Sequence, residues 1–161
     1  MPRTDNEIRI TPSVLDRLID YEPEISREPP ASRSKSLRQL KQSVKRDLEW
    51  LLNTRLAPGF LPPDLEEVNH SLAAYGLTEF TSFNVKTQAD QSRLRRTLEG
   101  VIGTFEPRLE EVNVTLLPMQ QGQSAVHFRV DARLRIEPAP EPITFDTALQ
   151  IDNGEYVVKE G

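Results

Sequence analysis

Residues 126–136, VHFRVDARLRI, alternate without a break between apolar and polar side chains. The apolar members are Val126, Phe128, Val130, Ala132, Leu134 and Ile136. A period of two residues is typical of a β-strand that buries one face and exposes the other to water. This stretch therefore predicts one strand of an antiparallel sheet with a solvated face.

Strand patterns also lie on both sides of this segment. Apolar and polar side chains alternate over residues 112–116, and again over residues 143–151 beyond a break at Pro138, Pro140 and Pro142. Several short alternating segments separated by turn residues indicate neighbouring strands of one sheet. We expect an antiparallel sheet of about four strands in the last third of the chain.

The fourth strand is predicted by a turn. Asn and Gly follow one another at positions 153–154, which favours a two-residue hairpin loop. Such a loop would pair Ile151 with Tyr156 and Leu149 with Val158 on one face of the sheet.

Helical periodicity dominates the first two thirds of the chain. Apolar side chains recur every three or four residues from Ser36 to about Arg55, which predicts a long amphipathic helix. A second helix is expected to open at Thr87, which forms a capping-box pattern with Asp90, and to run to Phe105. The fold class is therefore α+β, with N-terminal helices packed on a C-terminal antiparallel sheet.

Two shorter helices are also expected. Asp64 is a candidate cap for a helix that Gly76 ends, because glycine readily adopts the left-handed conformation after a helix. Near the N-terminus, Thr11 and Pro12 are the residue types that begin helices, and the segment that follows is apolar as far as Ile19.

The N-terminal region has a composition of its own. Residues 21–36 contain Pro23, Pro29 and Pro30 and few apolar side chains, so they cannot bury enough surface to offset the entropy lost on ordering. We therefore divide the chain into an arm, residues 1–35, with a short helix and a flexible linker, and a single α+β domain, residues 36–161.

Composition disfavours several classes of protein. The 161 residues include 25 acidic and 20 basic side chains, a formal net charge of -5, which disfavours a general nucleic-acid binder. Cysteine is absent and His70 and His127 are the only histidines, so we expect no metal site; phosphate-loop and dinucleotide motifs are also missing, so we expect no cofactor. The sequence has neither a membrane-length apolar run nor a secretory signal, and a cytoplasmic protein is expected.

The long helix carries the largest charge asymmetry. Residues 33–55 hold seven basic and two acidic side chains, while the whole chain is acidic. Such a face can dock an acidic partner or phosphate, or it can be an ordinary solvated surface, and the pattern leaves both interpretations open.

Few residues are candidates for catalysis. Ser124 lacks the second glycine of a nucleophile elbow. The acids available for glycoside hydrolysis are Glu66, Glu67, Glu106, Glu110 and Glu111. Adjacent carboxylates point apart, a sugar cleft usually needs aromatic platforms, and Trp50 is expected in core or interface packing. We therefore assign no catalytic residue.

The most unusual local feature is Glu106-Pro107-Arg108, at the predicted corner between helix and sheet. Pro107 ends the helix because it has no backbone N–H to donate, and it favours extended geometry at Glu106. The corner can present a carboxylate and a guanidinium to a partner, or the two can form an internal ion pair. The pattern leaves both arrangements open.

Three segments resemble the TssE family of type VI secretion baseplate proteins, which are similar to the small wedge protein 25 of contractile phage tails. They are residues 103–109 (GTFEPRL), the basic helix that ends in Leu-Asn-Thr-Arg at 52–55, and the Tyr-Gly-Leu-x-x-Phe turn at 75–80. The segments occur in the family's order, and the correspondence extends from about Ser13 to Val158.

The resemblance implies a structural role without enzymatic activity. Members sit in the cytoplasmic baseplate, docked at the inner membrane complex, with the wedge subunits TssF and TssG and the adaptor TssK. They join this wedge to the first ring of the contractile sheath, built from TssB and TssC. Neither nucleic acid nor direct membrane insertion is implied.

The resemblance also assigns a site. Glu106, Pro107 and Arg108 correspond to the family's assembly motif, which contacts the wedge, and the sheet from Val112 to Val158 resembles the strand-exchange domain of sheath subunits. If the motif acts through a partner, Glu106→Ala or Arg108→Ala should leave the monomer folded and block assembly. A large loss of thermal stability would instead indicate an internal ion pair.

Three other functions are possible. The first is a peptidoglycan-cleaving muramidase, in keeping with the family's historical label "lysozyme-related". The second is a nucleic-acid adaptor that uses the basic helix, with binding that weakens steeply with salt. The third is an interaction module of another complex.

Overall fold

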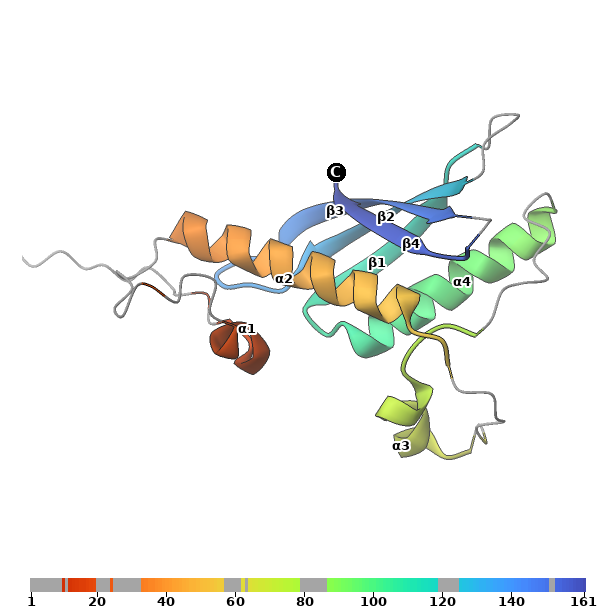
Figure 1. The fold of residues 1–161 in the computed structure, drawn as a ribbon, viewed down its shortest axis with the longest axis horizontal. Helices are drawn as coiled ribbons and strands as arrows, with labels where there is room; N and C mark the ends of the chain where they lie inside the picture. The colour runs from red at the N-terminus through yellow and green to blue at the C-terminus, as the bar shows by residue number, and fades with distance from the viewer. Residues whose placement is uncertain are drawn as a thin grey trace, which may run out of the picture.

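The computed structural model describes residues 10, 12–19, 24, 33–56, 62, 64–78, 87–118, 125–150 and 153–161. The helices come first and the strands last, which confirms the α+β class (Figure 1). The elements in chain order are α1 (Val14–Leu18), α2 (Arg33–Asn53), α3 (Glu66–Asn69), the 3-10 turn η1 (Leu72–Ala74), α4 (Gln88–Phe105), β1 (Leu109–Leu116), β2 (Ala125–Leu134), β3 (Glu141–Gln150) and β4 (Tyr156–Glu160).

The four strands form one antiparallel sheet in the order β1-β2-β3-β4. The alternation that predicted β2 is confirmed, because its apolar side chains are buried from Val126 to Leu134 and His127 and Arg129 are exposed. Ile136 lies beyond the end of the strand and is half-buried.

The two long helices share a core with the buried face of the sheet (Figure 1). α2 packs along β4 and α4 packs along β1, so each helix lies beside one edge strand. The buried leucines Leu48 and Leu98, one from each helix, belong to the same cluster as Phe128 and Phe145 of the sheet. The molecule is therefore two-layered, with helices on one face of the sheet.

The predicted hairpin register is wrong. Leu149 pairs with Tyr156 and Thr147 pairs with Val158, so β4 is shifted by two residues from the expected pairing. The loop is longer to match: the N–H of Gln150 donates to the carbonyl of Glu155 at 2.8 Å, which leaves four residues between the strands instead of two. Because the shift is an even number, each side chain keeps the predicted face.

The helix ends agree with the sequence in part. Thr87 caps α4 by accepting from the N–H of Asp90, as predicted. The prediction for Asp64 is wrong, since α3 begins after Leu65 without a side-chain cap and spans one turn. The predicted start of the N-terminal helix at Thr11 and Pro12 is wrong, because Pro12 lies before the helix and the N-cap of α1 is Ser13, which accepts from the N–H of Asp16.

The predicted start of the long helix is late, because α2 begins at Arg33 and not at Ser36. The division into arm and domain stays a prediction. Several residues of the sequence predictions lie outside the described part of the chain, namely Thr11, the prolines of the linker, Phe80, Ser124 and Ile151. In the described part, no helix is long and apolar enough to cross a bilayer.

Tyr156 is the largest fully buried side chain and stacks edge-on against Phe128, with 6.0 Å between the ring centroids. Its hydroxyl has no hydrogen-bond partner among the described residues. Burial raises the pKa of Tyr156 to about 12, although the charge of Arg55 opposes this effect. The folded state therefore strongly favours the neutral phenol.

We expect Tyr156→Phe to leave stability unchanged at pH 7 or to raise it by about 1 kcal/mol, because the variant loses no hydrogen bond. In the wild type, Tyr156 ionises near pH 10 in the unfolded chain and near pH 12 in the folded one. Its neutral form therefore contributes about 2–3 kcal/mol of stability that is complete below about pH 10 and is lost as the pH rises to about 12. Urea unfolding of both chains at pH 7 and pH 11 measures the difference. Equal alkaline losses in the two chains would contradict this origin.

Candidate functional site

The corner between α4 and β1 is a tight turn built by Glu106-Pro107-Arg108. The N–H of Glu106 closes the helix on the carbonyl of Ile102 at 2.9 Å, and the N–H of Leu109 donates to the carbonyl of Glu106 at 3.0 Å. Glu106 has φ -120° and ψ 76°, outside the helical region, as the following proline requires. The chain therefore changes from helix to strand within three residues.

Glu106 and Arg108 form an internal ion pair. Arg108 Nε donates to Glu106 Oε1 at 2.6 Å, and Arg108 Nη2 contacts Glu106 Oε2 at 2.5 Å. Glu106 is only 3% exposed, whereas Pro107 is exposed and Arg108 partly so. Of the two arrangements left open by the sequence, this chain adopts the internal pair. Whether the motif also contacts a partner stays a prediction.

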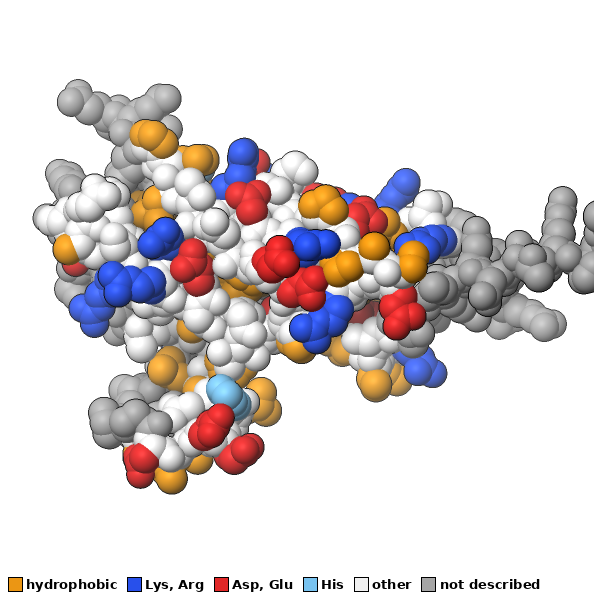
Figure 2. Space-filling view, turned by 180° about the vertical axis from the view of Figure 1, so that it is seen from behind, with side chains coloured by type: hydrophobic (Ala, Val, Ile, Leu, Met, Phe, Trp, Pro, Cys, Tyr) orange, Lys and Arg blue, Asp and Glu red, His pale blue; other side chains and the backbone are white. Residues whose placement is uncertain are grey.

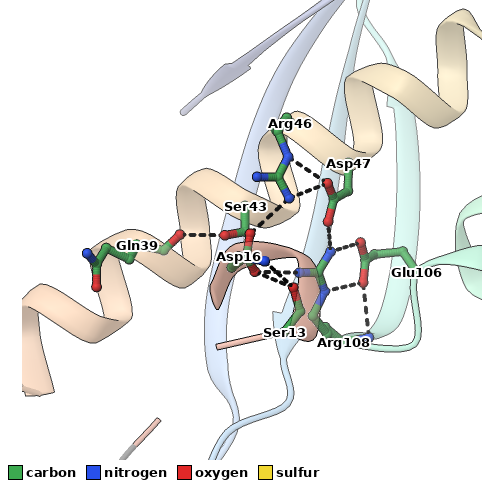
Figure 3. A network of polar contacts seen from close by, with 8 residues as sticks. All are labelled: Ser13, Asp16, Gln39, Ser43, Arg46, Asp47, Glu106 and Arg108. Carbon is green, nitrogen blue, oxygen red and sulfur yellow. Dashed lines mark hydrogen bonds and ion pairs between the residues drawn. The ribbon is translucent and has the colours of Figure 1, made fainter. Parts of the chain in front are cut away.

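Two aspartates complete the site, and the sequence analysis did not connect them with it. Asp47 of α2 accepts from Arg108 Nη2 at 2.5 Å and from Arg46 Nε at 2.8 Å. Asp16 of α1 accepts from Arg46 Nη2 at 2.9 Å. Three carboxylates and two guanidinium groups thus form one network that joins α1, α2 and the corner (Figure 3).

The network fixes the charge of its members. Burial alone would lower the pKa of Arg108, but the hydrogen bonds and negative charges of Glu106 and Asp47 raise it above its ordinary value. Burial likewise tends to raise the pKa of Asp16, but hydrogen bonds from Ser13, Ser43 and Arg46 outweigh it and lower that pKa. Both groups are therefore charged at neutral pH.

One donor in the network is unsatisfied. Arg108 Nη1 is buried and has no hydrogen-bond partner among the described residues. Asp16 Oδ2 of α1 lies 4.0 Å from it. A distance of 4.0 Å permits electrostatic attraction but is too long for a hydrogen bond. The contact between α1 and the corner thus leaves one hydrogen-bond donor of Arg108 unpaired among the described residues.

α1 is attached mainly through polar groups. Within this helix no side chain is buried, and Val14 and Leu18 are 72% and 76% exposed. Hydrophobic side chains stand out at the surface where α1 lies, at the lower right of Figure 2. Ile10, before α1, packs partly against the core.

We expect the free energy that holds α1 in place to be small. Ion pairs contribute little net stability, because both charges lose water when they pair. Ordering the backbone costs about 1–2 kcal/mol per residue, and α1 offsets little of this by burying apolar surface.

The Leu-Asn-Thr-Arg segment holds the last hairpin against α2. The Asn53 side chain accepts from the N–H of Tyr156 at 2.8 Å and donates to its carbonyl at 2.9 Å. Arg55 donates to the carbonyls of Gly154 and Leu52. This segment therefore binds the outer edge of β4 as a strand would.

The opposite edge of the sheet is covered in the same way. The N–H of Val114 in β1 donates to the Glu99 carboxylate of α4 at 3.0 Å. On β4, the N–H of Val158 points to the Glu49 carboxylate at 3.4 Å. Side chains of α2 and α4 thus occupy backbone groups on both edge strands, which protects the sheet from unwanted strand pairing.

The Tyr-Gly-Leu turn packs beside the corner. Leu77 exchanges backbone hydrogen bonds of 2.8 Å with Thr54 and Leu56, and Gly76 has φ +112°. Tyr75 lies edge-on to Phe105, with 5.4 Å between centroids. Burial, together with the charges of Asp47 and Glu106, raises the pKa of Tyr75. The three segments that carry the resemblance therefore meet around one end of α2.

The carboxylates considered for hydrolysis do not gather into one site. Glu66 and Glu67 are exposed on α3, and acidic side chains gather where α3 lies, at the lower left of Figure 2. Glu106 is engaged by Arg108, while Glu110 and Glu111 pair with arginines of the sheet region. In the described ranges, no three His, Asp or Glu side chains gather as metal ligands.

The basic helix does not present its charges as one open face. Arg46 contacts two aspartates, Lys41 pairs with Glu141 at 3.1 Å, and Arg55 binds backbone carbonyls. Trp50 is 51% exposed, so of the expected core or interface packing the core alternative is wrong and the interface alternative stays a prediction. Arg46 lies over its ring at 5.0 Å from the centroid. Exposed arginines also occur at Arg93, Arg95 and Arg96 of α4, and basic side chains gather over α4 at the left of Figure 2.

Comparison with known proteins gives one informative result. A protein-family model described as "Baseplate wedge protein gp25" matches residues 38–139, from α2 through β2 and including the corner. A search of curated proteins finds no match.

Proposed function

Because this chain belongs to the gp25 family of baseplate wedge proteins, we propose that it links the wedge of a type VI secretion baseplate to the first ring of the contractile sheath. The family gives the chain a structural role in a phage-like baseplate. The proposal adds the partners, which are TssF, TssG and TssK on the wedge side and TssB and TssC on the sheath side. It also adds a cytoplasmic location, docked at the inner membrane complex.

The observation that carries the proposal is that the residues of the corner differ in exposure and in their contacts. Glu106 is buried and pairs with Arg108, while Pro107 is exposed at the apex of the turn. A turn fixed in this way loses little entropy when a partner binds it. We assign the wedge contact to Pro107 and the accessible part of Arg108, and we assign Glu106 the task of positioning them.

The sheath contact is assigned to the sheet, with a constraint from its edges. A strand that adds to β4 beside Tyr156 must first displace the Asn53 side chain, which occupies both backbone groups there. Main-chain pairing supplies affinity in such strand addition. The closed edge supports a model in which the free chain does not pair with strands before assembly.

A muramidase is disfavoured by the site itself. A general acid in glycoside hydrolysis must be able to give up its proton at a substrate oxygen. Glu106, the one buried candidate, instead has both carboxylate oxygens engaged by Arg108. We therefore assign no catalytic role to the corner.

Co-expression with TssF, TssG and TssK tests the wedge assignment. We expect the wild type to co-purify with the wedge, and Pro107→Glu to reduce its retention at least tenfold, since a charge at the apex must be desolvated in the contact. Pro118→Glu is the matched control, because Pro118 is also exposed but lies beyond the opposite end of β1.

Two results would contradict the proposal. Failure of the wild type to co-purify at any salt concentration would reject the wedge role for this chain. Equal retention of both variants, with urea midpoints like the wild type, would show that the corner is not the contact.

A further inference from the structure

We propose that Arg46 and Arg108 form a carboxylate-binding surface that α1 covers in the free chain, and that an acidic side chain of the wedge partner displaces Asp16 from it. This inference rests on the proposed wedge role and adds the chemistry of the partner. The occupant is a segment of the wedge that carries an Asp or Glu.

The first observation is the chemistry of the covered surface. Arg46 and Arg108 are held side by side by Asp47, which accepts from both. The guanidinium groups are thus fixed in position, with side chains 19% and 23% exposed, and both face Asp16 of α1, through Arg46 Nη2 and Arg108 Nη1. Fixed guanidinium groups bind carboxylates well, because their geometry is already set before the ligand arrives.

The second observation is that Asp16 fills this surface imperfectly. It reaches Arg46 at 2.9 Å but stays 4.0 Å from Arg108 Nη1, which is buried without a hydrogen bond among the described residues. A carboxylate that approached Nη1 more closely would satisfy this donor and relieve the cost of leaving it unpaired. A partner's side chain can therefore bind here more favourably than Asp16 does.

The third observation is the attachment of α1. The helix has no buried side chain of its own, so a competitor has to break ion pairs and hydrogen bonds but removes no buried side chain of α1 from the core. Val14, Leu15 and Leu18 are already exposed while α1 is bound. Displacement of α1 is therefore cheap compared with unfolding any element of the core.

Energy transfer can follow α1 directly, because the chain has a single tryptophan and no cysteine. Trp50 lies beside Arg46, and Leu18→Cys places one thiol on an exposed position of α1 for a dansyl acceptor. We expect transfer from Trp50 to fall by at least half when Asp16→Asn is added. The acetylated and amidated peptide SVLDRL, residues 13–18, at millimolar concentration should lower it likewise, and the same peptide with Asn for Asp should not.

Binding to the purified TssF–TssG–TssK wedge distinguishes two roles of Asp16. It either competes with a carboxylate of the wedge, or it only stabilises the fold. Asp16→Asn should bind about two- to fivefold more tightly, because it removes the competitor. Arg46→Gln should also release α1 but bind at least fivefold more weakly, because it removes a carboxylate-binding group. These two substitutions break the same ion pair, so a structural role alone would shift affinity in the same direction for both.

Unchanged energy transfer in Asp16→Asn, or equal effects of the two peptides, would overturn the proposal. Weaker wedge binding by Asp16→Asn would also overturn it, since α1 would then be part of the interface. If the wild type does not bind the wedge at all, the proposed function fails. The energy-transfer results then still decide whether α1 covers a carboxylate-binding surface.

Discussion

Arg108→Ala should lower the free energy of unfolding of the isolated chain by about 3–5 kcal/mol, because the substitution leaves the Glu106 carboxylate buried without its counter-charge. Glu106 is 3% exposed, so water cannot replace the lost guanidinium. The same substitution removes a partner of Asp47. For a chain with a total stability of about 5–15 kcal/mol this is a large fraction, and urea unfolding at pH 7 measures it.

Arg129→Ala provides the matched control for this substitution. Arg129 also pairs with an aspartate, Asp146, at 2.9 Å, but the two side chains are 46% and 45% exposed. We expect a loss much smaller than that of Arg108→Ala, since water solvates the aspartate that is left behind. Similar losses in the two variants would show that burial of Glu106 does not matter.

A double-mutant cycle with Glu106→Gln completes the test. Once the buried charge is gone, Arg108→Ala should cost much less than it does in the wild type, because no carboxylate is stranded. This expectation replaces the one drawn from the sequence, in which changes at the motif left the monomer intact. The ion pair is internal, so assembly defects in Arg108→Ala must be separated from loss of folded protein.

Gly76→Ala should destabilise the chain by about 3–5 kcal/mol. The backbone of Gly76 has φ +112°, and a Cβ there would lie 2.6 Å from the carbonyl oxygen of Thr54. Strained backbone at such a position costs about 1–3 kcal/mol. The displaced Thr54 carbonyl also accepts the N–H of Leu77, so this bridge between the end of α2 and the turn would weaken by about 1 kcal/mol or more.

Gly100→Ala is the control for the second prediction. Gly100 lies within α4, and a Cβ there would meet nothing within 4 Å. We expect a gain of about 0.5–1 kcal/mol, because alanine loses less backbone entropy on entering a helix. Thermal or urea unfolding of the two variants should therefore give shifts of opposite sign, and a loss in both would contradict the conformational argument for Gly76.

The two predictions bear on the wedge contact proposed at the corner. Glu106 fixes Arg108, and the turn around Gly76 holds Tyr75 and the end of α2 beside it. We therefore expect substitutions at these positions to change the shape of the proposed contact surface as well as single atoms on it. Exposed Pro107 is the position at which contact can be changed with the least effect on folding.

Local patterns in the sequence were enough to predict the long helices and the strands. The two-residue period of β2 and the three-to-four-residue periods of α2 and α4 reflect local backbone geometry and one buried side, and both are visible in a short window. The cap at Thr87 and the corner at Pro107 are equally local, because each depends on groups within three residues. The α+β class followed from the order of these patterns.

The contacts between these elements could be seen only in the folded structure. The contacts of Asp16 with Arg46 and of Asp47 with Arg108 join residues that are 30 and 61 positions apart. The bonds of Asn53 to Tyr156 span 103 positions. Such pairings depend on how α2 crosses the sheet, which is set by packing of the whole core, and a charged or amide side chain carries no local sign of its distant partner. The same applies to the hairpin, where the pairing of β4 followed its contacts with α2 and β3 and not the preference of Asn153 and Gly154 for a two-residue turn.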